Sequence, residues 1–134
     1  MAKQLILISH GLFCEELKKS TEMIMGPQDI IHTVGLLPEE GPDDFRLKLE
    51  EKMAELKEFV VLADLMGGTP CNVASRMVME GKGFDLYAGM NMPMIIGFLN
   101  GVLLGEDIDL VEFGSTNIHH INDLLSFNEN DEDD

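Results

Sequence analysis

Two short runs of consecutive apolar residues constrain the fold of this chain most strongly. Leu5–Ile8 leads into His10, and Phe59–Ala63 leads into Asp64. A short, continuous apolar run predicts a strand that is buried on both faces, as in the centre of a parallel sheet. Each run therefore places a polar side chain at the carboxyl end of a strand, which is where ligands bind in open parallel sheets.

The rest of the chain predicts an alternation of helices and strands. Amphipathic, charged segments alternate with short β-branched or apolar ones, and Gly or Pro separates most of them. This order indicates an α/β fold: a doubly wound, four-stranded parallel sheet with helices on both faces. We expect helices at Phe13–Met25, Asp43–Leu56, Met94–Leu104 and Ser115–Phe127, a helix from Pro70 to about Glu80 with Thr69 as its N-cap, and further strands at Asp29–Val34, Phe84–Ala88 and Ile108–Phe113. The last of these alternates with a period of two, which suits an antiparallel edge strand.

The composition limits the size and the partners of the protein. A length of 134 residues suits a single domain, which we place at 1–127, and the acidic residues 128–134 are expected to be a disordered tail. No stretch resembles a secretory signal or a membrane span, so a cytoplasmic location is expected. Twenty-five acidic residues against nine basic ones give a net charge of −16. This charge argues against binding to nucleic acid or anionic membranes, which relies on Lys and Arg.

His10 and Asp64 meet at one edge of the sheet if their strands are neighbours. A carboxylate that engages one imidazole nitrogen leaves the lone pair of the other nitrogen available as a nucleophile. A histidine held in this way can accept a phosphoryl group. Backbone N–H groups and one hydroxyl would stabilise that group, and we expect them to come from Gly11, Gly67, Gly68 and Thr69. Phosphoryl transfer depends mainly on positioning and charge stabilisation, so we expect neither a metal nor a cofactor.

Other patterns favour structural roles. The chain contains neither GxxxxGK[ST] nor GxGxxG, so nucleotide binding is not expected. His119 and His120 would point about 100° apart on a helix, which makes them poor joint metal ligands, and His32 within a strand is expected to be structural. A hypothesis concerns four methionines in or beside the loops that flank the site. They would form an adaptable docking surface for two successive protein partners: Met66, Met90, Met92 and Met94.

Three segments stand out together in this order: ISHG at 8–11, DLMGGTPCNVASR at 64–76 and AGMNMPM at 88–94. They resemble the enzyme IIA component of the mannose family of the bacterial sugar phosphotransferase system, over about residues 3–105. The resemblance implies that His10 accepts a phosphoryl group from the phosphocarrier protein HPr and passes it to enzyme IIB. It implies that Asp64 orients the ring and that Thr69 contacts the phosphoryl group. It also implies a sheet in the order 2-1-3-4 and a homodimer that exchanges an additional antiparallel strand.

Two other functions are compatible with these residues. The phosphocarrier subunit of a dihydroxyacetone kinase system shares the strand-end histidine but feeds a kinase, and the DLMGGTP segment favours the transporter component instead. A non-catalytic regulatory domain would only bind an anion at His10. Stable covalent phosphorylation separates this last function from the first two. Which imidazole nitrogen accepts the group depends on which one Asp64 engages.

Overall fold

The structure of the protein is a computed structural model that describes residues 3–125. One sheet of four parallel strands has the order β2-β1-β3-β4. The strands are β1 (Gln4–His10), β2 (Ile31–Leu36), β3 (Phe59–Ala63) and β4 (Asp85–Ala88). The predicted fold class and strand order are confirmed, and the exchange of a strand between two subunits stays a prediction.

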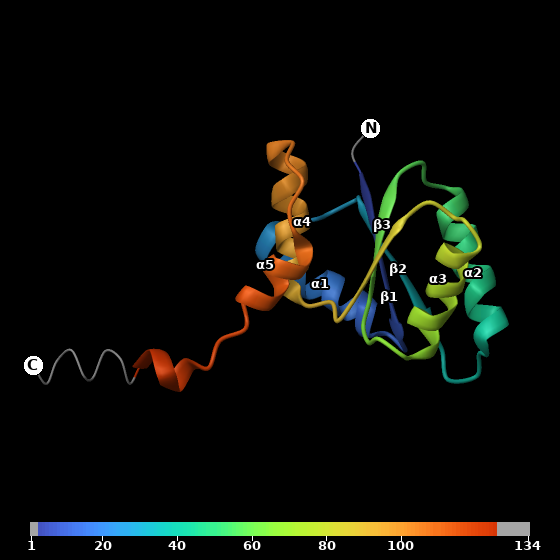
Figure 1. Cartoon of the computed structure of the whole chain (residues 1–134), viewed down its shortest axis with the longest axis horizontal. Helices are drawn as coiled ribbons and strands as arrows, with labels where there is room; N and C mark the ends of the chain where they lie inside the picture. Colours follow the sequence, from blue (N-terminus) through green and yellow to red (C-terminus); the bar gives the residue numbers. More distant parts are fainter. Residues whose placement is uncertain (1–2, 126–134) are drawn as a thin grey trace, which may run out of the picture.

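Helices cover both faces of the sheet (Figure 1). They are α1 (Phe13–Met25), α2 (Pro42–Ala54), α3 (Thr69–Met79), α4 (Met92–Leu104) and α5 (Leu110–Thr116). Leu5 and Leu7 of β1 belong to the core beneath α1, α4 and α5, while Ile6 and Ile8 belong to the core beneath α2 and α3. All four side chains are fully buried, as expected for an apolar run in which successive side chains point to opposite faces.

Up to Leu104, the observed bounds of the helices and strands agree closely with the bounds predicted from the sequence. Phe13–Met25 and Phe59–Ala63 begin and end where predicted, and the other elements up to that residue differ by one or two positions. Within residues 3–125, no helix combines the length and the apolar character needed to cross a membrane.

The prediction of a strand at Ile108–Phe113 is wrong. Asp109 is instead the N-cap of α5, because its Oδ1 accepts a hydrogen bond from the backbone N–H of Glu112 at 3.1 Å. Leu110, Phe113 and Gly114 then lie on one side of the helix, at the i, i+3 and i+4 spacing, and face α4. The apparent period of two covers too few residues to outweigh this cap and this packing.

The prediction of one helix over Ser115–Phe127 is also wrong, since α5 ends at Thr116. The backbone is helical again at 121–125, where the described residues end. Residues 126–127 and the acidic tail at 128–134 lie outside the described part of the chain.

Close packing between α4 and α5 depends on Gly114, and this contact predicts the effect of a substitution. A Cβ atom at Gly114 would overlap with Cγ of Met94, so Gly114→Ala should lower the free energy of unfolding by about 1–3 kcal/mol. Urea unfolding followed by circular dichroism measures this change. Ser115→Ala, at the exposed neighbouring position, is the control. Because alanine otherwise favours a helix over glycine, equal stability of the two variants would contradict the proposed packing.

Candidate active site

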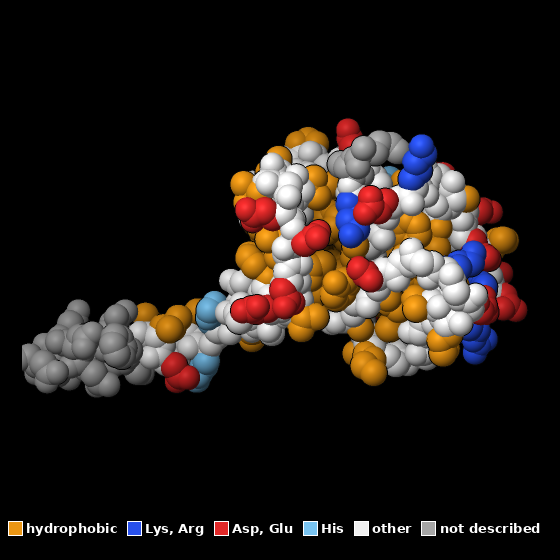
Figure 2. Space-filling model, turned by 45° about the horizontal axis from the view of Figure 1, so that its top comes forward, with side chains coloured by type: hydrophobic (Ala, Val, Ile, Leu, Met, Phe, Trp, Pro, Cys, Tyr) orange, Lys and Arg blue, Asp and Glu red, His pale blue; other side chains and the backbone are white. Residues whose placement is uncertain are grey.

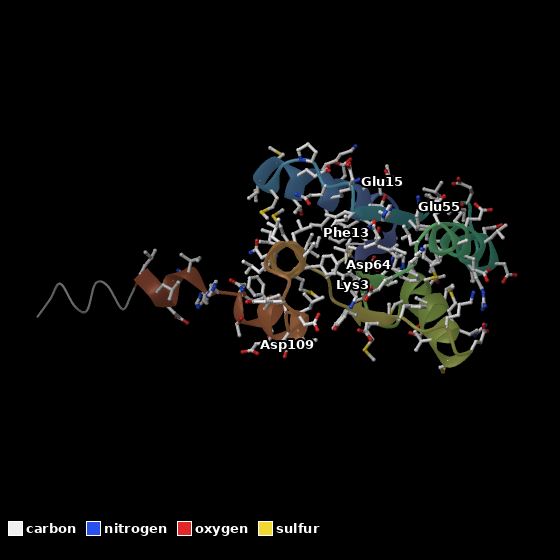
Figure 3. All side chains as sticks on the ribbon, turned by 90° about the horizontal axis from the view of Figure 1, so that it is seen from above. Lys3, Phe13, Glu15, Glu55, Asp64 and Asp109 are labelled. Carbon is white, nitrogen blue, oxygen red and sulfur yellow. The ribbon has the colours of Figure 1, made fainter. Side chains whose placement is uncertain are left out.

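The carboxyl ends of β1 and β3 bring His10 and Asp64 together. These strands are neighbours, with Ile8 paired with Ala63, and the N–H of Asp64 donates to the carbonyl oxygen of Ile8 at 3.1 Å. His10 is the last residue of β1, and Asp64 directly follows β3. Asp64 lies between the helices that cover the two faces (Figure 3), at the edge where an open parallel sheet binds its ligands.

A single oxygen of Asp64 holds both the backbone and the ring of His10. Oδ2 accepts the backbone N–H of His10 at 2.9 Å and lies 2.8 Å from the ring nitrogen Nδ1. An ionised carboxylate can only accept hydrogen bonds, so Nδ1 is the nitrogen that carries the proton. In the neutral imidazole, Nε2 then carries the lone pair.

The burial of the two side chains is unequal. Asp64 is 12% exposed and His10 is 50% exposed, so the carboxylate is covered while half of the imidazole surface reaches solvent. The second oxygen of Asp64, Oδ1, is buried and accepts no hydrogen bond from the residues that the structure describes. Asp64 therefore contacts His10 through Oδ2, and this carboxylate lies on the buried side of the imidazole.

The imidazole lies against the backbone of Gly68. A Cβ atom on Gly68 would be 2.5 Å from Cε1 and 3.1 Å from Nε2 of His10. Non-bonded carbon atoms normally keep about 3.5 Å or more between them, so only glycine leaves room for the ring here. Gly67 before it has a φ of 88°, a left-handed conformation that also favours glycine. The predicted glycine loop thus contacts His10.

Helix α3 begins at this loop, one residue earlier than predicted. Gly68 is the N-cap, rather than Thr69, and Thr69 is the first helical residue. Because glycine has no side chain, no side-chain cap satisfies the first N–H groups of α3. Asn72 supports the loop, since its Nδ2 donates to the carbonyl oxygen of Gly67 at 3.3 Å. Asn72 was not among the predicted site residues.

On the other side of His10, the turn at Gly11 is fixed to β2. The N–H of Gly11 donates to the carbonyl oxygen of Leu36 at 2.7 Å, so this donor is used within the fold. Gly35 of β2 lies so close that a Cβ atom there would overlap with the carbonyl oxygen of Gly11. Gly35 was not among the predicted site residues, because the strand was expected to end at Val34; inside the longer β2, a glycine is typical of close backbone approach.

Exposed apolar side chains occupy the turn after Asp64 and the segment that leads from the turn after His10 into α1. Leu12, Phe13, Leu65 and Met66 are each more than half exposed, and we call these four residues the docking surface. The hypothesis that four methionines form such a surface is wrong for two of them, because Met90 and Met94 are buried in the core beneath α4. Asn91 caps α4 by accepting the N–H of Met94 at 3.0 Å, which turns this part of the chain inward.

The remaining histidines lie outside the site. His32 is partly buried, and its Nε2 lies 2.8 Å from Oε1 of Gln4. Burial, followed by the nearby positive charge of Lys52, lowers the pKa of His32, which fits the predicted structural role. His119 and His120 are exposed, and His120 lies 3.1 Å from Asp123. Within residues 3–125, no group of three or more His, Cys, Asp or Glu side chains is arranged to hold a metal ion.

The fold and the site define a doubly wound α/β protein with a carboxylate-oriented histidine at the carboxyl edge of its sheet. The family model EIIA-man, described as the PTS system fructose IIA component, matches residues 4–111. The chain belongs to this family, whose members are components of the sugar phosphotransferase system. The predicted family is therefore confirmed.

Relatives agree with this assignment. The chain is 31% identical to the mannose-specific EIIAB component of the phosphotransferase system from Escherichia coli K12, over 72% of this chain and 31% of the relative. It thus spans less than a third of that protein's length.

Two solved structures are also similar. One is the PTS IIA protein associated with the fucose utilization operon of Streptococcus pneumoniae, with a TM-score of 0.80, 27% identity, and coverage of 93% of this chain and 99% of that one. The other is the mannose/sorbose specific IIA subunit from Enterococcus faecalis, with a TM-score of 0.75, 31% identity, and coverage of 90% and 95%.

The contact between Gly68 and His10 predicts that Gly68→Ala displaces the ring. The imidazole would have to move by about 1 Å to restore normal contact, which lengthens the bond from Nδ1 to Asp64. We expect the ¹⁵N chemical shifts of the His10 ring to change in NMR spectra. Gly83→Ala is a matched control, because nothing lies within 4 Å of the added Cβ atom there. Unchanged His10 signals in Gly68→Ala would show that the ring tolerates the added Cβ atom without moving, which contradicts the close contact between Gly68 and His10.

Proposed function

We propose that this chain is a phosphoryl carrier of the sugar phosphotransferase system. His10 would accept a phosphoryl group from phospho-HPr and pass it to enzyme IIB for sugar uptake. The observation that carries this proposal is the 2.8 Å contact between Oδ2 of Asp64 and Nδ1 of His10, which leaves Nε2 as the nucleophile. Membership of the EIIA family supports the same role.

The transfer step follows from this geometry. The lone pair of Nε2 attacks phosphorus, the bond from phosphorus to the donor nitrogen breaks, and the donor ring keeps that electron pair. Nδ1 of His10 keeps its proton, so the phosphorylated ring is positively charged beside the carboxylate of Asp64. Asp64 therefore stabilises the product as well as orienting the nucleophile. Transfer to IIB repeats the exchange, with the bond from Nε2 to phosphorus as the one that breaks.

Backbone groups would bind the phosphoryl oxygens. The loop at Gly67 and Gly68 lies beside the ring, and the uncapped N-terminus of α3 favours negative charge. The Thr69 side chain makes no hydrogen bond within residues 3–125, so its hydroxyl is available as a donor. Gly11 would contribute by fixing the turn, since its N–H already donates to Leu36.

Two protein partners would use the docking surface in turn. A single histidine serves both, so HPr and IIB must approach the same exposed half of the ring. Apolar side chains there, including the adaptable Met66, suit partners of different shape. The relatives are named for mannose, fucose and sorbose, and a chain that hands on only a phosphoryl group needs no sugar contact. The single domain at 1–127 and the cytoplasmic location stay predictions.

Phosphorylation of His10 is the first prediction of this proposal. Incubation of the chain with phosphoenolpyruvate, enzyme I and HPr should add one acid-labile phosphoryl group, detected by intact mass at neutral pH. His10→Ala should gain none, whereas His119→Ala, an exposed histidine away from the site, should behave as the wild type. Asp64→Asn should slow the reaction at least about tenfold, because the uncharged amide does not stabilise the positively charged phosphorylated ring and can turn its NH₂ group towards Nδ1, which removes the fixed orientation of the ring.

Each other outcome contradicts a named part of the proposal. No phosphorylation while HPr itself is phosphorylated would favour the non-catalytic anion-binding domain. A phosphorylated chain that donates to a dihydroxyacetone kinase subunit and not to IIB would overturn the transporter role. Wild-type rates in Asp64→Asn would overturn the orienting role of the carboxylate.

We also propose that the chain is a homodimer. Segment 117–125 lies apart from the body of the fold, and it carries apolar side chains (Figures 1 and 2). Four of these are more than half exposed: Ile118, Ile121, Leu124 and Leu125. A cavity of about 500 Å³ lies between β3 and β4 on one side and α4 on the other, lined in part by Tyr87, Phe98 and Val102. A second copy that placed this segment over that cavity would cover the apolar side chains of the segment and those that line the cavity.

The oligomeric state tests this proposal directly. Sedimentation equilibrium should give the mass of a dimer for the wild type and of a monomer for Ile121→Asp, which puts a charge into the interface. Asn122→Asp adds the same charge next to it and should remain dimeric. A monomeric wild type would overturn the proposal, as would a dimer that both substitutions leave unchanged.

A further inference from the structure

The turn that carries His10 is held from two sides. On one side, Oδ2 of Asp64 accepts the backbone N–H of His10 at 2.9 Å. On the other side, the N–H of the next residue, Gly11, donates to Leu36 at 2.7 Å. The direction of the imidazole therefore depends on the position of the carboxyl end of β2 as well as on Asp64.

This end of β2 cannot move independently of the turn. Gly35 and the carbonyl oxygen of Gly11 are in such close backbone contact that a side chain at Gly35 would overlap with it. Closely packed protein interiors transmit displacements to their neighbours. Whatever fixes Gly35 therefore fixes the turn after His10.

Lys48 of α2 fixes Gly35. Its Nζ donates to the carbonyl oxygen of Gly35 at 2.6 Å and to Oε1 of Glu40 at 2.7 Å. Oε1 of Glu40 also accepts the backbone N–H of Leu37 at 2.8 Å. One ammonium group thus joins α2, the end of β2 and the loop that follows β2. Hydrogen bonds to ionised groups are about twice as strong as neutral ones.

The pair is partly shielded from water. The side chain of Glu40 is 16% exposed and that of Lys48 is 36% exposed. The hydrogen bond from Lys48, followed by that from the N–H of Leu37, lowers the pKa of the Glu40 carboxyl. A group with a lowered folded pKa contributes stability above its unfolded pKa and loses it as the pH falls through the folded pKa. The Glu40 carboxyl is therefore ionised at neutral pH.

We propose that Lys48 is a positioning residue for the nucleophile, although it does not contact His10. Its ammonium group holds Gly35, Gly35 holds the turn at Gly11, and this turn sets the direction in which Nε2 points. This role rests on the proposed function, because it concerns phosphoryl transfer from His10. Helix α2 contributes no residue to the site itself, but through Lys48 it takes part in the reaction.

Lys48→Met tests the role, since methionine keeps the length of the side chain but donates no hydrogen bond. In single-turnover phosphorylation by phospho-HPr, the maximal rate should fall about tenfold, because small misplacements of reacting groups slow a transfer strongly. The apparent affinity for phospho-HPr should stay the same, since the docking surface is intact. Lys48→Arg, which can donate to both acceptors, should recover part of the rate.

Lys52→Met is the matched control. Lys52 lies one turn further along α2 and pairs with Glu55 at 3.1 Å, and within residues 3–125 its side chain donates no hydrogen bond to the backbone of β2. It should retain the wild-type rate. If Lys48→Met does not fold, Glu40→Gln provides the second test, because it weakens the ion pair and keeps the bond from Lys48 to Gly35. A maximal rate that is lower than that of the wild type, but by less than the tenfold expected for Lys48→Met, is then expected, and a rate equal to that of the wild type would overturn the positioning role.

A second readout does not require phosphorylation. The ¹⁵N signals of the His10 ring and the amide signal of Gly11 should shift in unphosphorylated Lys48→Met and stay in place in Lys52→Met. If wild-type chain is never phosphorylated but these shifts occur, the proposed function fails and the positioning by Lys48 stands. If Lys48→Met matches Lys52→Met in both the NMR signals and the rate, the positioning role is overturned.

Discussion

The site depends on the adjacency of β1 and β3. Parallel pairing of these strands, with Ile8 opposite Ala63, brings the residue that ends one strand beside the residue that follows the other. One carboxylate oxygen can then accept from both the backbone and the ring of His10. A different strand order would separate the two side chains by at least one strand spacing of about 4.8 Å, and the hydrogen bond would be lost.

Two glycines allow the close packing around His10 because they have no side chain. At Gly68 and at Gly35, a side chain would overlap with the imidazole or with the turn that carries it. The ring therefore lies between the carboxylate of Asp64, the backbone of Gly68 and the turn at Gly11, which contacts β2. Backbone atoms of packed strands move less than long side chains do, so this construction fixes the imidazole of His10 without a large set of charged residues.

Sequence patterns predicted the parts of the fold that depend on local periodicity. The runs at Leu5–Ile8 and Phe59–Ala63 carry the pattern of central strands, and both their burial and the contact between the residues that follow them were foreseeable. The structure of Ile108–Phe113 was predicted wrongly. The helix cap at Asp109 and the packing on α4 outweigh the short alternation of apolar and polar residues in this segment. Met90 and Met94 were placed on the surface because their loop adjoins the site, but only tertiary packing decides which way a loop residue turns.

The links to Lys48 could not be predicted for the same reason. Lys48 belongs to a charged helix face, and nothing in its neighbours indicates that its ammonium group reaches the carbonyl oxygen of Gly35. Most lysines on such a face make weak, exposed pairs that contribute little. Lys48 differs because one of its acceptors is a backbone atom in the sheet, so its bond acts on the position of a strand. For a carrier of the proposed kind, which would meet two partners with one nucleophile, such a bond would set the direction of the ring before either partner arrives and would reduce the cost of orienting it at each transfer.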